Sequence, residues 1–174
     1  MVSFKSVFTL GLVGSAGATC EEVRPGCGEV NIFFTGLPAH HPIVAAIGLN
    51  TTMVDVMLRR DAARVIAAGY NLKVVHMGPE IDMSVMEEAM QGQTWHGTGV
   101  GYGMRGSQRP DVTIRFEEVL ELFRSEASDA PTMFNYNGDT FTWALQRRMP
   151  LASDCADSPG IDYGYDVHCD VCAQ

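Results

Sequence analysis

The run GTGVGYGMRG, residues 97–106, is the stretch whose composition most directly indicates a binding site. It places glycine at positions 97, 99, 101, 103 and 106, with Arg105 inside it. Glycine lets a ligand approach backbone N–H groups closely, and a guanidinium binds anions through parallel hydrogen bonds. We therefore expect a small polar or anionic molecule to contact Gly101, Gly103, Arg105, Gly106 and Ser107, together with Gly36 at the end of the first expected strand.

Residues 101–106 also fit the pattern G-x-G-x-x-G, which binds the pyrophosphate of a dinucleotide when it follows the first strand of the fold. Here the pattern follows the third expected strand, and the next expected helix starts only at Asp111. Three interpretations stay open: a general anion site, a nucleotide-cofactor site, and a tight turn whose arginine faces solvent or a carboxylate. No cofactor is assigned.

Two histidines and two asparagines follow other expected strands. His40 and His41 come after the first strand, which ends near Gly36, and either could act as a general acid or base near neutral pH. Asn135 and Asn137 end the fourth strand and could bind a polar ligand or form a turn. Exposed loop histidines are the alternative to a catalytic role, so whether the protein is an enzyme stays undecided.

The cysteines cluster near the two ends of the chain, at Cys20, Cys27, Cys155, Cys169 and Cys172. In an oxidising compartment they would join the two ends by disulfides, and their odd number leaves one thiol free or paired between chains. His168 and the last two cysteines form H-C-x-x-C, for which a disulfide, a metal site and a redox site are alternatives. Because a convincing fourth ligand is missing from the sequence pattern, we assign no metal.

The beginning of the chain resembles a secretory signal. Lys5 precedes a short apolar stretch, and Ala16-Gly17-Ala18 fits the cleavage pattern A-x-A. The sequence Asn50-Thr51-Thr52 is a glycosylation acceptor, which agrees with secretion. A formal net charge of -9 argues against nucleic acid or an anionic membrane as partner. We therefore expect a secreted protein that does not bind membranes once residues 1–18 are removed.

Hydrophobic periodicity predicts alternating strands and helices. Buried strands are expected at 30–35, 72–77, 94–102 and 131–136, and helices at 52–69, 84–91, 111–123 and 140–149. Thr52, Ser84, Asp111 and Asp139 have the side chains expected at helix starts. This alternation predicts a small parallel α/β sheet of about four strands in the order 2-1-3-4, Rossmann- or flavodoxin-like, with helices on both faces. Residues 19–150 would form this domain, and 151–174 an acidic surface tail.

Four segments within residues 30–150 resemble a group of small, uncharacterised Rossmann-like proteins from fungi and bacteria. They are VNIFFTGL, the glycine strand leading into GYGMRG, FEEVLELFR, and PTMFNYN followed by a capped helix. The resemblance implies the Rossmann-like fold and brings no established activity with it.

The leading functional expectation is a secreted α/β domain that binds a small polar or anionic ligand beyond the carboxyl ends of its strands, where such sheets bind ligands. The alternatives are a secreted interaction protein without catalytic activity and a nucleotide-cofactor-dependent oxidoreductase.

Overall fold

A computed structural model describes residues 24–172, so the expected signal segment 1–18 and Cys20 lie outside the described residues. Five parallel strands form one sheet in the order β4-β3-β1-β2-β5. The strands are β1 (Asn31–Gly36), β2 (Asn71–Met77), β3 (Gly97–Val100), β4 (Thr132–Phe134) and β5 (Asp162–His168). The helices are α1 (Pro42–Ala46), α2 (Thr51–Ala67), α3 (Ser84–Met90), α4 (Tyr102–Arg105), α5 (Pro110–Glu126) and α6 (Phe141–Arg148).

The predicted α/β class with a parallel sheet is confirmed. The four expected strands are neighbours as anticipated, but the fifth, β5, pairs with β2 and extends the order beyond 2-1-3-4. Residues 151–174 are therefore more than the surface tail expected for them. The sequence pattern concealed β5 because it is an edge strand with acidic residues and a bulge that interrupts its alternation.

The bulge in β5 sends two tyrosines to opposite faces of the sheet. Leu72 of β2 pairs with Asp162, but Val74 pairs with Tyr165, so one additional residue is accommodated on β5. Gly164 adopts a φ of 109°, a backbone conformation that side chains disfavour. As a result Tyr163 packs against the core on the α5 face, and Tyr165 packs against the core on the α2 face.

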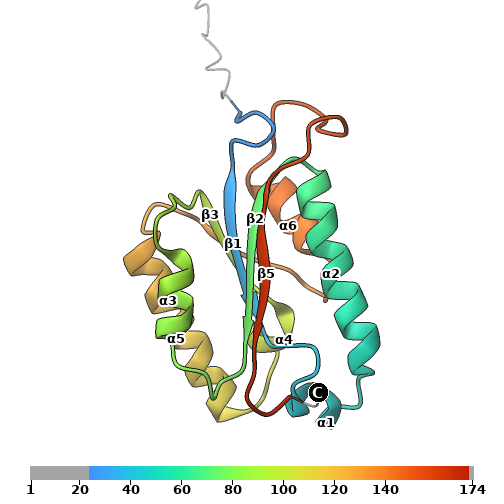
Figure 1. The fold of residues 1–174 in the computed structure, drawn as a ribbon, viewed down its shortest axis with the longest axis vertical. Helices are drawn as coiled ribbons and strands as arrows, with labels where there is room; N and C mark the ends of the chain where they lie inside the picture. The colour runs from blue at the N-terminus through green and yellow to red at the C-terminus, as the bar shows by residue number, and fades with distance from the viewer. Residues whose placement is uncertain (1–23, 173–174) are drawn as a thin grey trace, which may run out of the picture.

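Helices cover both faces of the sheet, and each face has its own apolar core (Figure 1). Helices α3 and α5 contribute Met86, Met90, Val119 and Phe123 to one core. The second core lies under α2 and α6 and contains Val65 and Phe141 among others. This arrangement follows from right-handed crossovers between parallel strands, which place successive helices on alternate sides where the chain reverses its direction across the sheet.

The glycines of β3 are required by close packing of α6. A Cβ atom at Gly99 would lie within 3.0 Å of Phe34 and Phe141, and one at Gly97 within 3.0 Å of Met133, Ile32 and Met149. The strand can therefore be buried although glycine weakens strands. The ring of Phe141, in α6, thus occupies the space that a side chain at Gly99 would need.

Several helix starts differ from those expected. Asn50 caps α2 through a 3.0 Å bond from Met53 N, in place of Thr52, and Met83 precedes α3, in place of Ser84. Helix α5 begins at Pro110, so Asp111 lies inside its first turn.

The N-terminus of α6 is capped by Asp61 of α2 and not by Asp139. Phe141 N donates a hydrogen bond to Oδ2 of Asp61 at 2.8 Å. Caps supplied by a distant side chain leave no local sequence pattern.

Two disulfides join the cysteines of the described residues. Cys27 pairs with Cys155 and ties the segment before β1 to the segment after α6, as expected for cysteines near the two ends. Cys169 pairs with Cys172 within the segment that follows β5.

Candidate functional site

Four residues form a row across the carboxyl ends of four neighbouring strands. Gly36 is in register with His76 of β2. On its other side, β3 and β4 continue the row at Gly101 and Asn135, one residue beyond the pairs Thr35–Val100 and Val100–Phe134. All four positions face α2 and α6, because side chains alternate along a strand and Phe34, Val74, Gly99 and Met133, two residues earlier, face that core. The row therefore has two glycines at its centre and a polar side chain at each end.

His76 forms one end of the row and is 1% exposed. Its Nδ1 lies 3.0 Å from the hydroxyl of Tyr165, whereas Nε2 has no hydrogen-bond partner among the described residues. The imidazole lies above Gly36, where a Cβ atom would be 3.6 Å from Nε2. Burial lowers the pKa of His76 to about 4, so the ring is neutral at physiological pH.

Tyr165, on the edge strand β5, contacts the His76 ring through its hydroxyl. Burial raises the pKa of Tyr165 to about 12, so its hydroxyl stays protonated. The guanidinium of Arg59 lies 4.6 Å from the centre of the tyrosine ring and is itself held by Asp55 at 2.9 Å. These contacts fix the tyrosine and thereby the orientation of the imidazole.

Asn135 forms the other end of the row and is also 1% exposed. Neither the oxygen nor the nitrogen of its carboxamide has a hydrogen-bond partner among the described residues. Its main-chain carbonyl accepts a hydrogen bond from Arg105, which fixes the backbone but leaves the side chain unpaired. Buried polar side chains are nearly always hydrogen-bonded, so the unpaired carboxamide of Asn135 and the unpaired Nε2 of His76 require an explanation.

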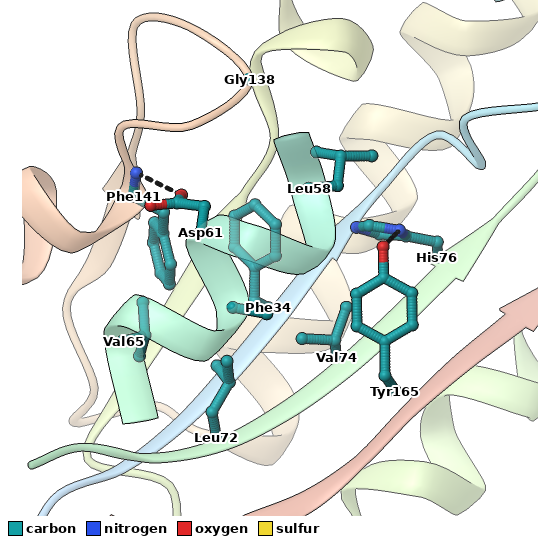
Figure 2. A pocket seen from close by; sticks show the side chains of 11 residues that line it. Phe34, Leu58, Asp61, Val65, Leu72, Val74, His76, Gly138, Phe141 and Tyr165 are labelled. Carbon is teal, nitrogen blue, oxygen red and sulfur yellow. Dashed lines mark hydrogen bonds between the residues drawn. The ribbon is translucent and has the colours of Figure 1, made fainter. Parts of the chain in front are cut away.

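A cavity of about 10 Å³ lies between α2 and the sheet beside His76 (Figure 2). Its lining includes Phe34, Leu58, Gly138 and Phe141, and Figure 2 shows the His76 imidazole pointing between Leu58 and Phe34. Asp61 also borders it, with both carboxylate oxygens engaged by Phe141 N and the hydroxyl of Thr142. Burial raises the pKa of Asp61. A volume of this size accommodates one water or one hydroxyl-sized group.

The glycine run after β3 folds differently from a phosphate-binding loop. Residues Tyr102–Arg105 form α4, and the N–H groups of Met104 to Ser107 donate to carbonyls within the run. Of the predicted ligand residues, Gly101 belongs to the row, whereas Gly103 and Gly106 are exposed and Ser107 Oγ accepts from Arg109 N. The anion site predicted there stays a prediction, with few of its backbone donors free.

Arg105 lies outside the cavity. Its guanidinium is 5.4 Å from the ring of Phe134 and 5.6 Å from the ring of Tyr102, and Phe134 packs on the α5 face. No carboxylate pairs with it among the described residues. The arginine therefore keeps free donors at the edge of the sheet, but on the opposite side from His76.

The two histidines proposed for proton transfer lie at the carboxyl edge and differ in environment. His40 is exposed. His41 is buried, caps α1 by accepting from Ile43 N at 3.1 Å, and places Nε2 3.1 Å from Glu80. Because Nδ1 accepts a hydrogen bond, the ring proton resides on Nε2, and this N–H group donates to the carboxylate of Glu80. A role as general base would require breaking this arrangement.

Asn137 serves the turn before α6, because its Oδ1 accepts from Gly138 N at 2.7 Å. The row, by contrast, brings together predicted residues Gly36, Gly101 and Asn135, and adds His76 and Tyr165, which were not anticipated. The position of His76 at the end of a buried strand was the available signal. Tyr165 could not be found from the sequence because the strand that carries it was not expected.

Comparison with known proteins does not extend this description: no family model, no curated protein and no solved structure matches the chain. The resemblance based on short motifs therefore stays a prediction. Within residues 24–172, no helix has both the length and the apolar character needed to cross a membrane.

Proposed function

We propose that the protein binds a small, uncharged polar molecule at the carboxyl edge of the sheet, between His76 and Asn135. The observation that carries this proposal is the row in which two buried, unpaired polar side chains flank Gly36 and Gly101. An unpaired buried polar group costs about 1–3 kcal/mol, so a ligand that pairs with it gains both affinity and specificity.

The charges at the site favour a neutral hydrogen-bonding ligand over an anion. His76 is neutral at physiological pH, and the guanidinium of Arg105 lies on the other face of the sheet. Asn135 offers one donor and one acceptor group, and His76 Nε2 offers either, depending on the tautomer. An alcohol, a polyol or a primary amide has the matching groups.

The small cavity limits how the ligand enters. It would admit one hydroxyl or amide group beside His76, so the rest of the molecule would displace the turn that contains Gly138 and precedes α6. Asp139 of this turn is held to α2 by Arg60 at 3.0 Å and Arg64 at 3.6 Å. These exposed ion pairs contribute about 0–1 kcal/mol each, so a ligand could separate them.

A buried water is the alternative occupant, and a ligand screen distinguishes the two. Polyols, amides and carboxylates would be tested by NMR, with the ring signals of His76 and the amide signals of Asn135 as reporters. We expect polyols or amides to shift both sets of signals in the wild type. They should leave the Asn135 amide signals unmoved in His76→Phe and the His76 ring signals unmoved in Asn135→Leu. The matched control is Glu117→Gln, on the exposed face of α5. If no compound moves either signal, the proposal fails and the cavity holds only water.

We also propose that the protein works in an oxidising compartment outside the cytosol. Both pairs of cysteines in the described residues form disulfides, which persist in secreted proteins. Mass spectrometry of protein isolated from its source would test this. The expected product lacks residues 1–18 and retains both disulfides, and an intact Met1 with reduced cysteines would contradict it.

An interaction protein is the second candidate, supported by an exposed apolar surface at the start of α2. Ile47, Leu49, Met53 and Val56 are between 50% and 69% exposed. Apolar groups gathered on a surface often mark contacts with other proteins. Replacing Met53 and Val56 by serine should abolish such a contact without affecting the signals of His76.

A further inference from the structure

The segment after β5 meets two potential metal ligands that the sequence pattern did not connect with it. A ring nitrogen of His41, a carboxylate oxygen of Glu80 and the sulfur of Cys169 all lie within 4.8 Å of one another, and Nε2 is the His41 nitrogen that faces Glu80, at 3.1 Å. Cys172 is joined to Cys169 by the disulfide and is therefore adjacent. In Figure 1 the segment that follows β5, drawn in red, runs to α1, the helix that His41 caps. The fold thus brings His41 and Glu80 to the cysteines of the H-C-x-x-C motif, which lacked a convincing fourth ligand when the sequence was considered alone.

The surrounding backbone holds these groups together. Glu80 accepts from Asp170 N at 3.2 Å through one oxygen and contacts His41 Nε2 at 3.1 Å through the other. Gly78 N donates to His168 O at 3.1 Å. A Cβ atom at Gly78 would collide with the Glu80 carboxylate, so glycine at that position makes room for it. The cysteine segment is consequently attached to the turn after β2 at two points.

We propose that reduction of the Cys169–Cys172 disulfide opens a Zn²⁺ site formed by Cys169, Cys172, His41 and Glu80. A thiol or phosphine reductant supplies two electrons and is oxidised, the S–S bond breaks, and two protons convert the sulfurs to thiols. Zn²⁺ then displaces both thiol protons, which pass to the solvent. Two thiolates, one imidazole and one carboxylate match the tetrahedral coordination that Zn²⁺ prefers.

The disulfide keeps the site closed in the structure, because sulfurs bonded to each other are not thiolate ligands. Zn²⁺ at Nε2 would also move the remaining ring proton of His41 to Nδ1, which now accepts from Ile43 N. Metal binding must therefore replace the cap of α1, so it is coupled to the conformation of this short helix. Reduction and metal binding together would act as a switch at the carboxyl edge.

Metal titration of the full chain tests the proposal. Mild reduction would be stopped when peptide mapping shows Cys169 and Cys172 to be free and Cys27–Cys155 intact, with the fold checked by circular dichroism. Cys155 is 2% exposed, whereas Cys169 and Cys172 are partly exposed, so a reductant reaches the second disulfide more easily. We expect one equivalent of Zn²⁺ to bind after reduction and none before it. Co²⁺ in its place should show thiolate-to-metal charge transfer.

Matched variants distinguish Zn²⁺ binding at the proposed site from Zn²⁺ binding by other thiols of the chain. The double variant Cys169→Ser/Cys172→Ser keeps the remaining cysteines and should bind no equivalent. His41→Asn can still cap α1 and Glu80→Gln can still accept from Asp170 N, yet each should weaken Zn²⁺ binding at least about tenfold. If selective reduction proves impossible, Cys27→Ala/Cys155→Ala provides a chain in which Cys169–Cys172 is the one disulfide left within residues 24–172.

Two outcomes would overturn the proposal. One is a reduced, folded wild type that binds no more Zn²⁺ than Cys169→Ser/Cys172→Ser. The other is unchanged affinity in both His41→Asn and Glu80→Gln, which would mean that the cysteines bind the metal without the residues that the fold brings to them.

Discussion

The hydroxyl of Tyr165 lies 3.0 Å from Nδ1 of His76, and this contact joins the edge strand β5 to the carboxyl end of β2. It depends on the bulge in β5, because without the additional residue the side chain of Tyr165 would leave the α2 face. Strand β5, which the sequence pattern did not predict, thus orients His76 at the candidate site.

Tyr165→Phe should therefore destabilise the fold. The substitution leaves both nitrogens of a buried imidazole without a protein partner, and the expected loss is about 1–3 kcal/mol in the free energy of unfolding. Urea denaturation measures it. Tyr163→Phe is the matched control, because its hydroxyl contacts the partly exposed Asn31 at 3.2 Å, and we expect a smaller loss. Equal losses in the two variants would show that the contact with His76 contributes nothing.

The protein should lose stability between pH 6.5 and pH 4 through His76. Its pKa falls from 6.5 to about 4 on folding, so the unfolded chain binds more protons within this window. The stabilisation is complete above pH 6.5 and decreases as the pH falls, by about 3 kcal/mol at most. Asp61, whose pKa is raised by burial, acts in the opposite direction, because the folded chain takes up its proton before the unfolded chain does.

Comparison of wild type and His76→Phe isolates this effect, because all other titrating groups are common to both. The difference in unfolding free energy between them should change across pH 4–6.5 and be constant above it. Titration of the His76 ring by NMR should give a midpoint near 4. A midpoint near 6.5 would contradict the burial that the structure assigns to the ring.

Gly99→Ala should destabilise the sheet by overpacking. The new methyl group would lie within 3.0 Å of the Phe34 and Phe141 rings, and crowding of this kind costs about 1–3 kcal/mol. Gly103→Ala is the control within the same glycine run. It has open space around it, lies in α4 and should be neutral or stabilising by up to about 1 kcal/mol. Thermal denaturation of the two variants gives the comparison, and a neutral Gly99→Ala would argue against close packing by α6.

The two disulfides should differ in their contribution to stability. Cys27 and Cys155 are 128 residues apart, so replacing both by serine should cost about 2–5 kcal/mol through the larger freedom of the unfolded chain. Cys169 and Cys172 are three residues apart and should contribute about 1–2 kcal/mol. Guanidinium denaturation of both double variants tests this ranking. The opposite order would indicate that the segment after β5 carries more of the fold than its position suggests.

Local patterns were sufficient for the α/β class. Runs such as Val30–Thr35 are apolar on both faces, which is typical of a central parallel strand, and helical periodicity identified the segments between the strands. The same reasoning correctly placed Gly36, Gly101 and Asn135 at one edge of the sheet, because the carboxyl ends of parallel strands all lie there. It also anticipated that cysteines near the two ends would be joined.

Tertiary structure alone decided what these positions do. The cap of α6 comes from Asp61, eighty residues away along the chain, and the partner of His76 comes from a bulged edge strand. Gly99 of β3 accommodates Phe34 and Phe141, and Glu80 joins His41 to the cysteine motif. Each of these relationships depends on side chains distant in sequence that meet only when the strands are in register. Periodicity reports the face on which a residue lies, but not the residue that it meets there.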